Sequence, residues 1–153
     1  MSISKLEEND IFLKKILDAP LGQVVTVLGE NLNCKICIDL IEQNTPKPGT
    51  KFIRKIVVSA DGLPIIRAMI KFDRTHLPDS IVNELLQKRS LVGTILNRYS
   101  ILNNKKVIST NFDKDGKKLY RIYEIQSHGR VLFEIDEEIK LDHLDLIRKK
   151  YHL

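Results

Sequence analysis

Apolar residues recur along the chain at two spacings, and each spacing predicts one kind of element. Spacings of three and four residues predict a helix over 11–17, which Pro20 ends, and a short helix over 24–28. The same spacing predicts three further helices, over 79–89, 92–98 and 141–151. Alternation of apolar and polar residues predicts six strands, over 33–41, 51–59, 63–72, 101–110, 118–127 and 130–139.

The order of these elements indicates the fold class. Helices are followed by three strands, then by helices and three more strands, and turn residues at 59–62, 113–116 and 127–129 join successive strands directly. This order favours an α+β fold over a parallel βαβ fold. We therefore expect a single domain over 1–153, with a six-stranded, mainly antiparallel sheet and helices packed on it.

Composition excludes several classes of protein. The chain has 153 residues, of which 42% are hydrophobic and 29% charged, as in ordinary globular domains. No apolar run reaches the ~20 residues of a membrane-spanning helix, and the acidic N-terminus is unlike a signal peptide. Two cysteines require no disulfide framework, so we expect a cytoplasmic protein without a membrane partner.

The net charge of +5 does not by itself indicate a nucleic-acid partner. Aromatic residues make up only 6% of the chain, tryptophan is absent, and no basic run alternates with aromatic side chains. The basic cluster at 148–150 is better explained as the C-terminal end of a helix, where cations oppose the helix dipole. We expect no nucleic-acid binding.

Cys34 and Cys37 form a CxxC pair, which can mark a redox or zinc site. Here the pair lies in a run with strand alternation, so the two side chains should point to opposite faces. One pair supplies two of four zinc ligands, and the four histidines are scattered. Glycine-rich phosphate loops are also missing from the sequence. We expect structural cysteines, no metal and no cofactor.

Two charged residues share the apolar face of a predicted strand. Arg54 alternates in phase with Phe52, Ile56 and Val58, and Glu137 alternates in phase with Phe133 and its apolar neighbours. Charges on such a face are costly unless they pair or bind something. Either the two form a buried salt bridge or reach water at strand ends, or they line a pocket in which Arg54 holds a carboxylate and Glu137 meets a hydroxyl or a proton.

Four segments resemble, in order and spacing, those of the chorismate lyase family. Residues 54–78 resemble its central hairpin, where an arginine opens a strand and Asp-Gly forms the turn. Residues 86–99 resemble its Pro-Leu-Gly segment, 128–139 its last hairpin with a glutamate, and 22–40 its N-terminal block. The resemblance covers about residues 10–140 and is closest to the shorter microbial branch of the family.

The resemblance implies a fold, an activity and a set of site residues. The fold is a six-stranded antiparallel sheet that encloses an aromatic-acid pocket under helical flaps. The activity is elimination of pyruvate from chorismate to give 4-hydroxybenzoate, without metal or cofactor. Arg54 matches the arginine that binds the ring carboxylate, and Glu137 matches the glutamate on the hydroxyl side. The other matched positions in the pocket are Val25, Thr26, Val92 and Gly93.

The sequence departs from the family pattern at three places. The segment before Gly93 has no proline, an ungapped count from Gly129 falls on Asp136 rather than Glu137, and an arginine of the ubiquinone-pathway enzymes falls on Met69. Strand alternation favours Glu137, because Asp136 is in phase with other acids. Arg67, two residues before Met69, is the nearest arginine.

A small-molecule binding domain is the alternative interpretation. Effector-sensing domains of bacterial transcription regulators share this fold, and many carry a turn like the one at 61–64. Those domains follow a DNA-binding segment of roughly seventy residues, which the sequence before residue 10 does not contain. Under either interpretation the partner is a small carboxylate such as chorismate, which the net positive charge would attract.

Overall fold

Helices and strands follow one another in the order that the hydrophobic spacing predicts. The computed structural model describes residues 11–19, 23–44, 49–88 and 90–150. The helices are α2 (Ile11–Asp18), α3 (Val24–Leu32), α4 (Asp79–Leu86), α5 (Val92–Arg98) and α6 (Leu141–Lys150), with a 3-10 turn, η1 (Arg74–His76). The strands are β1 (Ile36–Asn44), β2 (Lys51–Ala60), β3 (Leu63–Asp73), β4 (Asn104–Phe112), β5 (Lys118–Ser127) and β6 (Arg130–Lys140).

The six strands form one sheet in the order β1-β2-β3-β6-β5-β4, and every neighbouring pair is antiparallel. Tight hairpin turns join β2 to β3 and β5 to β6. Asp61 and Gly62 have φ angles of 49° and 80°, and His128 and Gly129 have φ angles of 51° and 76°. Two successive residues with positive φ are typical of tight hairpin turns. The expected α+β architecture with six antiparallel strands is confirmed.

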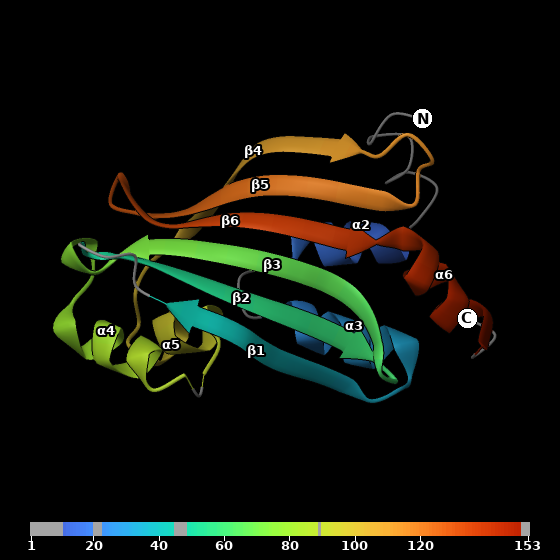
Figure 1. Cartoon of the computed structure of the whole chain (residues 1–153), viewed down its shortest axis with the longest axis horizontal. Coiled ribbons are helices and arrows are strands. Elements are labelled where there is room, and N and C mark those ends of the chain that lie inside the picture. The colour runs from blue at the N-terminus through green and yellow to red at the C-terminus, as the bar shows by residue number, and fades with distance from the viewer. Residues whose placement is uncertain (1–10, 20–22, 45–48, 89, 151–153) are drawn as a thin grey trace.

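The described helices leave one face of the sheet uncovered. In Figure 1, α2, α3, α4 and α5 lie behind the sheet and α6 lies at one end, so that the viewer looks onto a face without helices. We call this the open face and the other the covered face. No helix in the described ranges has the length and apolar character needed to span a membrane.

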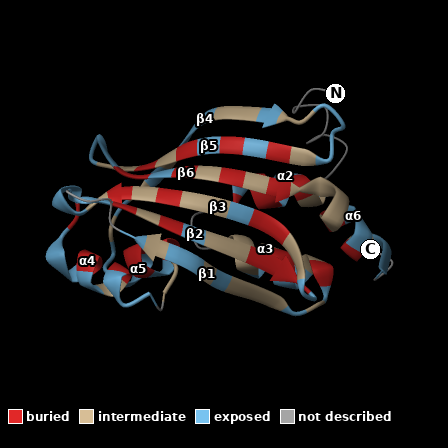
Figure 2. Ribbon diagram, in the orientation of Figure 1, coloured by how far each residue is buried: buried red, intermediate tan, exposed pale blue. Residues whose placement is uncertain are grey.

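The buried side chains form two clusters on the covered face, and Figure 2 shows buried segments of the sheet opposite both groups of helices. The first cluster packs α4 and α5 on the sheet, and the second packs α2, α3 and α6 on it. Both draw residues from β2, β3, β5 and β6, so the two helix groups share the same strands. Ile70 of β3 belongs to the first cluster, and Ile66 of the same strand belongs to the second.

Two strands begin later than the sequence pattern predicts. β1 begins at Ile36 rather than at residue 33, because Asn33 takes a left-handed φ of 51° where α3 ends. β4 begins at Asn104 rather than at 101, because Ser100 has a φ of 54° and the Asn103 side chain donates to the Ile101 carbonyl. Both strands lie at an edge of the sheet, and each contains a β-bulge, between Leu40 and Glu42 and between Val107 and Ser109.

Candidate functional site

A cavity of about 80 Å³ lies between the sheet and the helices, where the two clusters meet. Its lining comes from both sides of that boundary, with Ile70 and Ile135 from the first cluster and Val58 and Ile66 from the second. An engineered protein cavity that binds benzene measures about 150 Å³. The cavity is therefore smaller than an aromatic ligand needs, so binding of one would require the lining residues to move apart.

Arg54 lines this cavity from β2 and is one of the least exposed residues of the protein, at 1%. Its Nε donates to Gln43 Oε1 at 2.8 Å, its Nη1 to the Ser90 carbonyl at 2.7 Å and its Nη2 to the Leu85 carbonyl at 3.0 Å. A guanidinium carries five N–H groups. Within the described part of the chain, these three bonds leave one N–H on each terminal nitrogen for a ligand.

The partners of Arg54 are all neutral. No carboxylate of the described residues lies within ion-pair distance of its guanidinium. Burial lowers the pKa of Arg54, although an arginine side chain remains protonated at neutral pH. The cavity therefore contains a full positive charge that amide and carbonyl dipoles offset only in part, which favours an anion at this position.

Glu137 lines the same cavity from β6, but it pairs with Arg121 of β5 rather than with Arg54. Glu137 Oε1 accepts from Arg121 Nε at 3.0 Å and from Nη2 at 2.8 Å, and its Oε2 accepts from the Tyr123 hydroxyl at 3.2 Å. Burial, followed by the charge of Glu137, raises the pKa of Tyr123, so its hydroxyl stays protonated. The expectation that Arg54 and Glu137 could form a buried salt bridge is wrong, because Arg121 occupies the partner position.

Arg121 and Lys105 connect this network to the end of α2. Arg121 Nη1 donates to the Leu17 carbonyl at 2.7 Å, and Lys105 Nζ donates to the Ala19 carbonyl at 2.8 Å. Both cations also lie near the Tyr123 ring, at 4.8 and 5.0 Å from its centre. Burial, and then the charge of Arg121, lower the pKa of Lys105 to about 8. The last turn of α2 is thus held by the same side chains that line or adjoin the cavity.

Most of the residues expected from the sequence line the cavity. Val25 reaches it from α3, and Val92 and Gly93 reach it from the start of α5. Thr26, in contrast, is exposed and lines a separate surface depression with Asn97.

The residues at which the sequence departs from the family pattern, namely Asp136, Arg67 and Met69, lie on the open face. Asp136 is partly exposed there, with its carboxylate 4.0 Å from Lys71 Nζ. Arg67 and Met69 of β3 stand opposite Glu138 and Asp136 in the register of β6 and share that face. Strand alternation therefore separates Glu137, on the covered face, from both of its acidic neighbours.

Sequence reasoning did not identify Arg121, Tyr123 and Gln43. Arg121 and Tyr123 alternate in phase with Leu119 and Ile125, so the pattern that singled out Arg54 also contains them. Gln43 is different, because the bulge after Leu40 changes the phase of β1 and turns Gln43 toward Arg54. Alternation in the sequence gives no signal of that change.

The two cysteines are free thiols, and only Cys37 lies within β1. Cys34 precedes the strand and packs against the second hydrophobic cluster. Burial, and then the charge of Asp61, raise the pKa of the Cys34 thiol. A redox cysteine requires a lowered pKa, so the structural interpretation of this residue is the better supported one.

No family model and no curated protein matches the chain. Solved structures with a similar backbone include PhnF of Mycobacterium smegmatis, at a TM-score of 0.56 and 8% identity over 82% of this chain and 66% of that one. A GntR-family transcriptional regulator of Bacillus cereus gives a TM-score of 0.48 at 11% identity, over 70% and 92% of the two chains. YydK of Bacillus subtilis subsp. subtilis str. 168, a possible transcriptional regulator, gives 0.49 at 12% identity, over 73% and 60%. This chain spans about 60–66% of the length of YydK and PhnF. The likeness to PhnF shows that the two proteins share a fold.

Proposed function

We propose that the protein binds a small apolar or aromatic carboxylate in the cavity between its two helix groups. The observation that carries this proposal is the buried Arg54 guanidinium, which has only neutral partners among the described residues and N–H groups left on both terminal nitrogens. A carboxylate would complete its hydrogen bonds and neutralise its charge in one step.

The lining also favours a ligand with one anionic end. Arg54 and Glu137 lie two strands apart and two positions apart in register, which separates their Cα atoms by ~12 Å. The sheet between them presents Ala68 and Ile70, and the helices add Val25 and other apolar residues. A ligand with a carboxylate at Arg54, an apolar middle and a hydroxyl toward the Tyr123 side matches this sequence of groups.

Ligand entry would require α4 and α5 to move away from Arg54. Arg54 donates to the carbonyls of Leu85, in the last turn of α4, and of Ser90, two residues before α5, and Gln43 Nε2 donates to the same Leu85 carbonyl at 2.9 Å. A carboxylate that bound the two remaining N–H groups of Arg54 would lie close to these carbonyls, and its negative charge would repel their oxygens. Binding would then be coupled to a shift of α4 and α5, which is how a binding domain transmits occupancy.

The test is titration calorimetry with benzoate and 4-hydroxybenzoate, with methyl benzoate as the uncharged control ligand. Arg54→Lys keeps a positive charge but loses the planar fork, so affinity should fall by roughly ten-fold or more. Arg67→Lys makes the same change on the open face and should leave affinity unchanged. If Arg54→Lys and Arg54→Ala bind as well as the wild type, or the ester binds as well as the acid, the proposal is wrong.

The second candidate function is elimination of pyruvate from chorismate. It is supported by the presence of Arg54 and Glu137 in one cavity, which Tyr123 also lines and where its hydroxyl donates to Glu137. In such a reaction Arg54 would hold the ring carboxylate, and the N–H of Val92, at the start of α5, would provide a second contact. Glu137 would accept or relay a proton through Oε2.

Incubation with chorismate, followed by measurement of 4-hydroxybenzoate and pyruvate, tests the reaction. Glu137→Gln should abolish turnover, whereas Asp136→Asn, an equivalent change on the open face, should not. If turnover instead depends on Asp136, the assignment is wrong by one residue. Absence of both products from the wild type would exclude the lyase reaction and leave the binding function to the calorimetry.

A further inference from the structure

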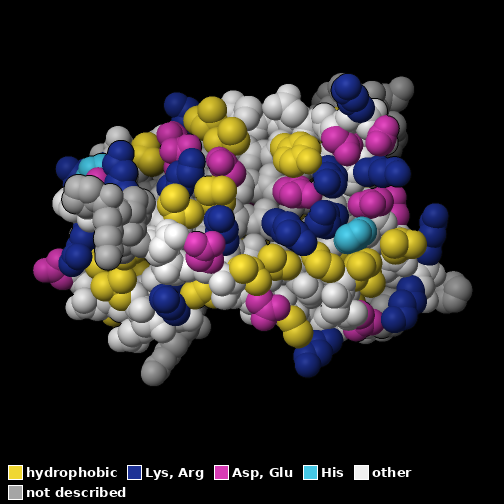
Figure 3. All heavy atoms as spheres, viewed as in Figure 1, with side chains coloured by type: hydrophobic (Ala, Val, Ile, Leu, Met, Phe, Trp, Pro, Cys, Tyr) yellow, Lys and Arg dark blue, Asp and Glu magenta, His cyan; other side chains and the backbone are white. Residues whose placement is uncertain are grey.

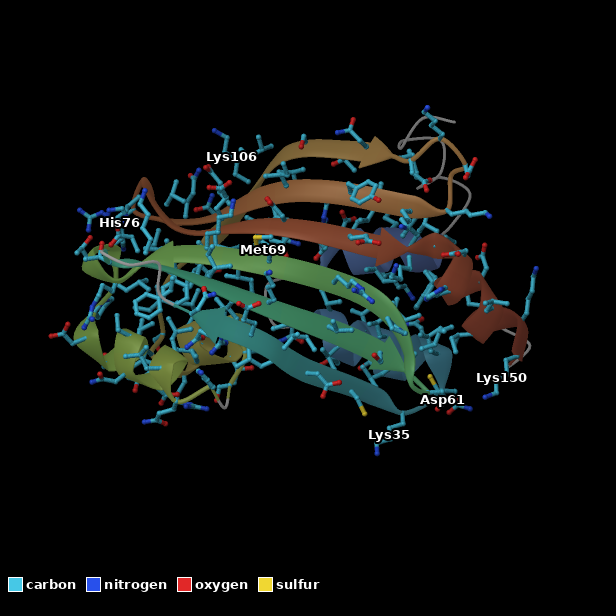
Figure 4. All side chains as sticks on the ribbon, in the orientation of Figure 1. Lys35, Asp61, Met69, His76, Lys106 and Lys150 are labelled. Atoms are coloured by element: carbon cyan, nitrogen blue, oxygen red, sulfur yellow. The ribbon has the colours of Figure 1, made fainter. Side chains whose placement is uncertain are left out.

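The open face of the sheet carries an ordered distribution of charge. β3 presents Arg67 and Lys71, and the neighbouring β6 presents Glu138 and Glu134 at the same levels of the register. Met69 lies between the two cations, near the middle of the face in Figure 4. The boundary between β3 and β6 is also the middle of the six-stranded sheet, so a basic row and an acidic row flank its centre line.

Apolar side chains surround these rows. Figure 3 shows hydrophobic side chains gathered among the charges on this face. A depression of about 440 Å³ opens near its centre, and its apolar lining includes Val57, Met69, Tyr120 and Ile122. Tyr120 is 41% exposed and Ile122 is 37% exposed, although both lie on β5, which has a neighbouring strand on each side. Within the described part of the chain, no helix covers them.

We propose that this face binds a second copy of the chain, face to face, about a two-fold axis that runs parallel to the strands between β3 and β6. This rotation places β3 of one copy over β6 of the other. Lys71 then faces the partner's Glu134, and Arg67 faces the partner's Glu138. A two-fold axis perpendicular to the strands would place β3 over β3 and oppose like charges, so charge complementarity selects the first arrangement.

The area of the face is sufficient for such an interface. Six strands at about 4.8 Å spacing, each about ten residues long at about 3.3 Å, give a surface of roughly 30 by 30 Å. Stable complexes bury about 800 Å² on each partner. Face-to-face sheets pack with their strands about 30° apart, which suits a two-fold axis along the mean strand direction. The covered face and its cavity stay accessible, so the proposal does not depend on the proposed function.

Charge reversal at one pair of positions tests the arrangement. Lys71→Glu should meet the partner's Glu134, and Glu134→Lys should meet the partner's Lys71. Because the two-fold axis repeats each contact, either variant should weaken self-association by about ten-fold or more. By sedimentation or light scattering, the wild type should have twice the chain mass of 17.6 kDa, and each variant should approach the single mass.

An equimolar mixture of Lys71→Glu and Glu134→Lys separates contacts between copies from contacts within one sheet. Within each variant, residues 71 and 134 carry charges of the same sign. Between the two variants, each charge at position 71 faces a charge of opposite sign at position 134 of the other chain. The mixture should therefore recover the double mass as a heterodimer. Lys14→Glu, on the exposed side of α2, makes the same change in charge and should remain dimeric. A monomeric wild type, dimeric single variants or a mixture that stays monomeric would each overturn the proposal.

Discussion

The charged side chains around the cavity are stabilised in two different ways. Arg121 and Glu137 are paired through hydrogen bonds of 3.0 and 2.8 Å, whereas the Arg54 guanidinium donates only to neutral oxygens among the described residues. For a paired ion, the attraction of its partner offsets much of the hydration free energy that is lost on burial. An unpaired ion has no such compensation. An anionic ligand would therefore stabilise Arg54 more than Arg121, which supports the proposal that its carboxylate binds at the Arg54 end of the cavity.

Lys105 should make the stability of the protein depend on pH in the alkaline range. Its pKa is about 8 in the folded protein, against an ordinary value of 10.5. Between these two values the unfolded chain binds more protons, so the stability of the folded state rises with pH. The melting temperature of the wild type should increase from pH 7.5 to pH 9.5 relative to that of Lys105→Met.

The neighbouring Lys106 provides the control for this measurement. Lys106 is exposed on the same strand, and Figure 4 shows it at the edge of the sheet. The difference in melting temperature between the wild type and Lys106→Met should not change over the same pH range. An equal pH dependence for both variants would show that Lys105 does not titrate in this window.

The sequence contains enough information to find the buried residues of regular strands, but not those that depend on irregular backbone. Alternation placed Arg54 and Glu137 on the covered face, because their strands keep a strict two-residue period around them. It could not show that Arg121 takes Glu137 as its partner, since that choice depends on which strands are neighbours. Gln43 was missed for a different reason, namely the phase change at the β1 bulge.

At the scale of elements, the glycine in α3 and the glycine in the β2–β3 turn have opposite effects on stability. Gly29 lies inside α3, where a β-carbon would meet only Ile36 Cγ1 at 4.0 Å, an ordinary contact. Gly62 has a φ of +80°, and nothing lies within 4 Å of the place where its β-carbon would be. The first glycine therefore lowers helix stability without a steric reason, and the second is required by backbone conformation alone.

Gly29→Ala should raise the free energy of unfolding by about 0.5–1 kcal/mol, because alanine favours the helix and restricts the unfolded chain. Gly62→Ala should lower it by about 1 kcal/mol, because the positive φ is retained by the hairpin. Urea titration of both variants measures the two effects. Destabilisation by Gly29→Ala would indicate that α3 does not tolerate closer contact with β1.

Element boundaries were predicted most accurately where turn residues determine them. α5 occupies 92–98 as expected, and the hairpins at 61–62 and 128–129 follow from residues that accept positive φ. β1 and β4 were displaced because the left-handed residues Asn33 and Ser100 extend the preceding turn. Such conformations are chosen by tertiary packing, and asparagine or serine at a position does not predict them on its own.

At the scale of the whole molecule, two hydrophobic clusters depend on one set of strands. Tyr123 belongs to the first cluster and Cys34 packs against the second, yet β2, β3, β5 and β6 cross both. If the sheet unfolded under one cluster, the other cluster would lose the strands on which its helices pack. If the cavity opens to admit a ligand, we expect the helices to move while the shared sheet stays intact.

Equilibrium unfolding in urea should consequently be a single transition. Tyrosine absorbance reports on the first cluster in a variant whose other three tyrosines (Tyr99, Tyr120 and Tyr151) are replaced by phenylalanine, and the reactivity of Cys34 in a Cys37→Ser background reports on the second. The two probes should give the same midpoint, as expected for a single cooperative domain. Separate midpoints would show that the helix groups unfold independently, in spite of their common strands.

The bulges in the two edge strands have a further consequence, for long-term storage of the folded protein. They divide β1 and β4 into runs of at most five consecutive register pairs. Amyloid spines are built from stacked segments of six or seven residues, and a template with an interrupted ladder cannot align a segment of that length. Fibril growth should therefore not start from the native edges, and seeded fibre assays should show a lag that shortens only when the protein is first unfolded.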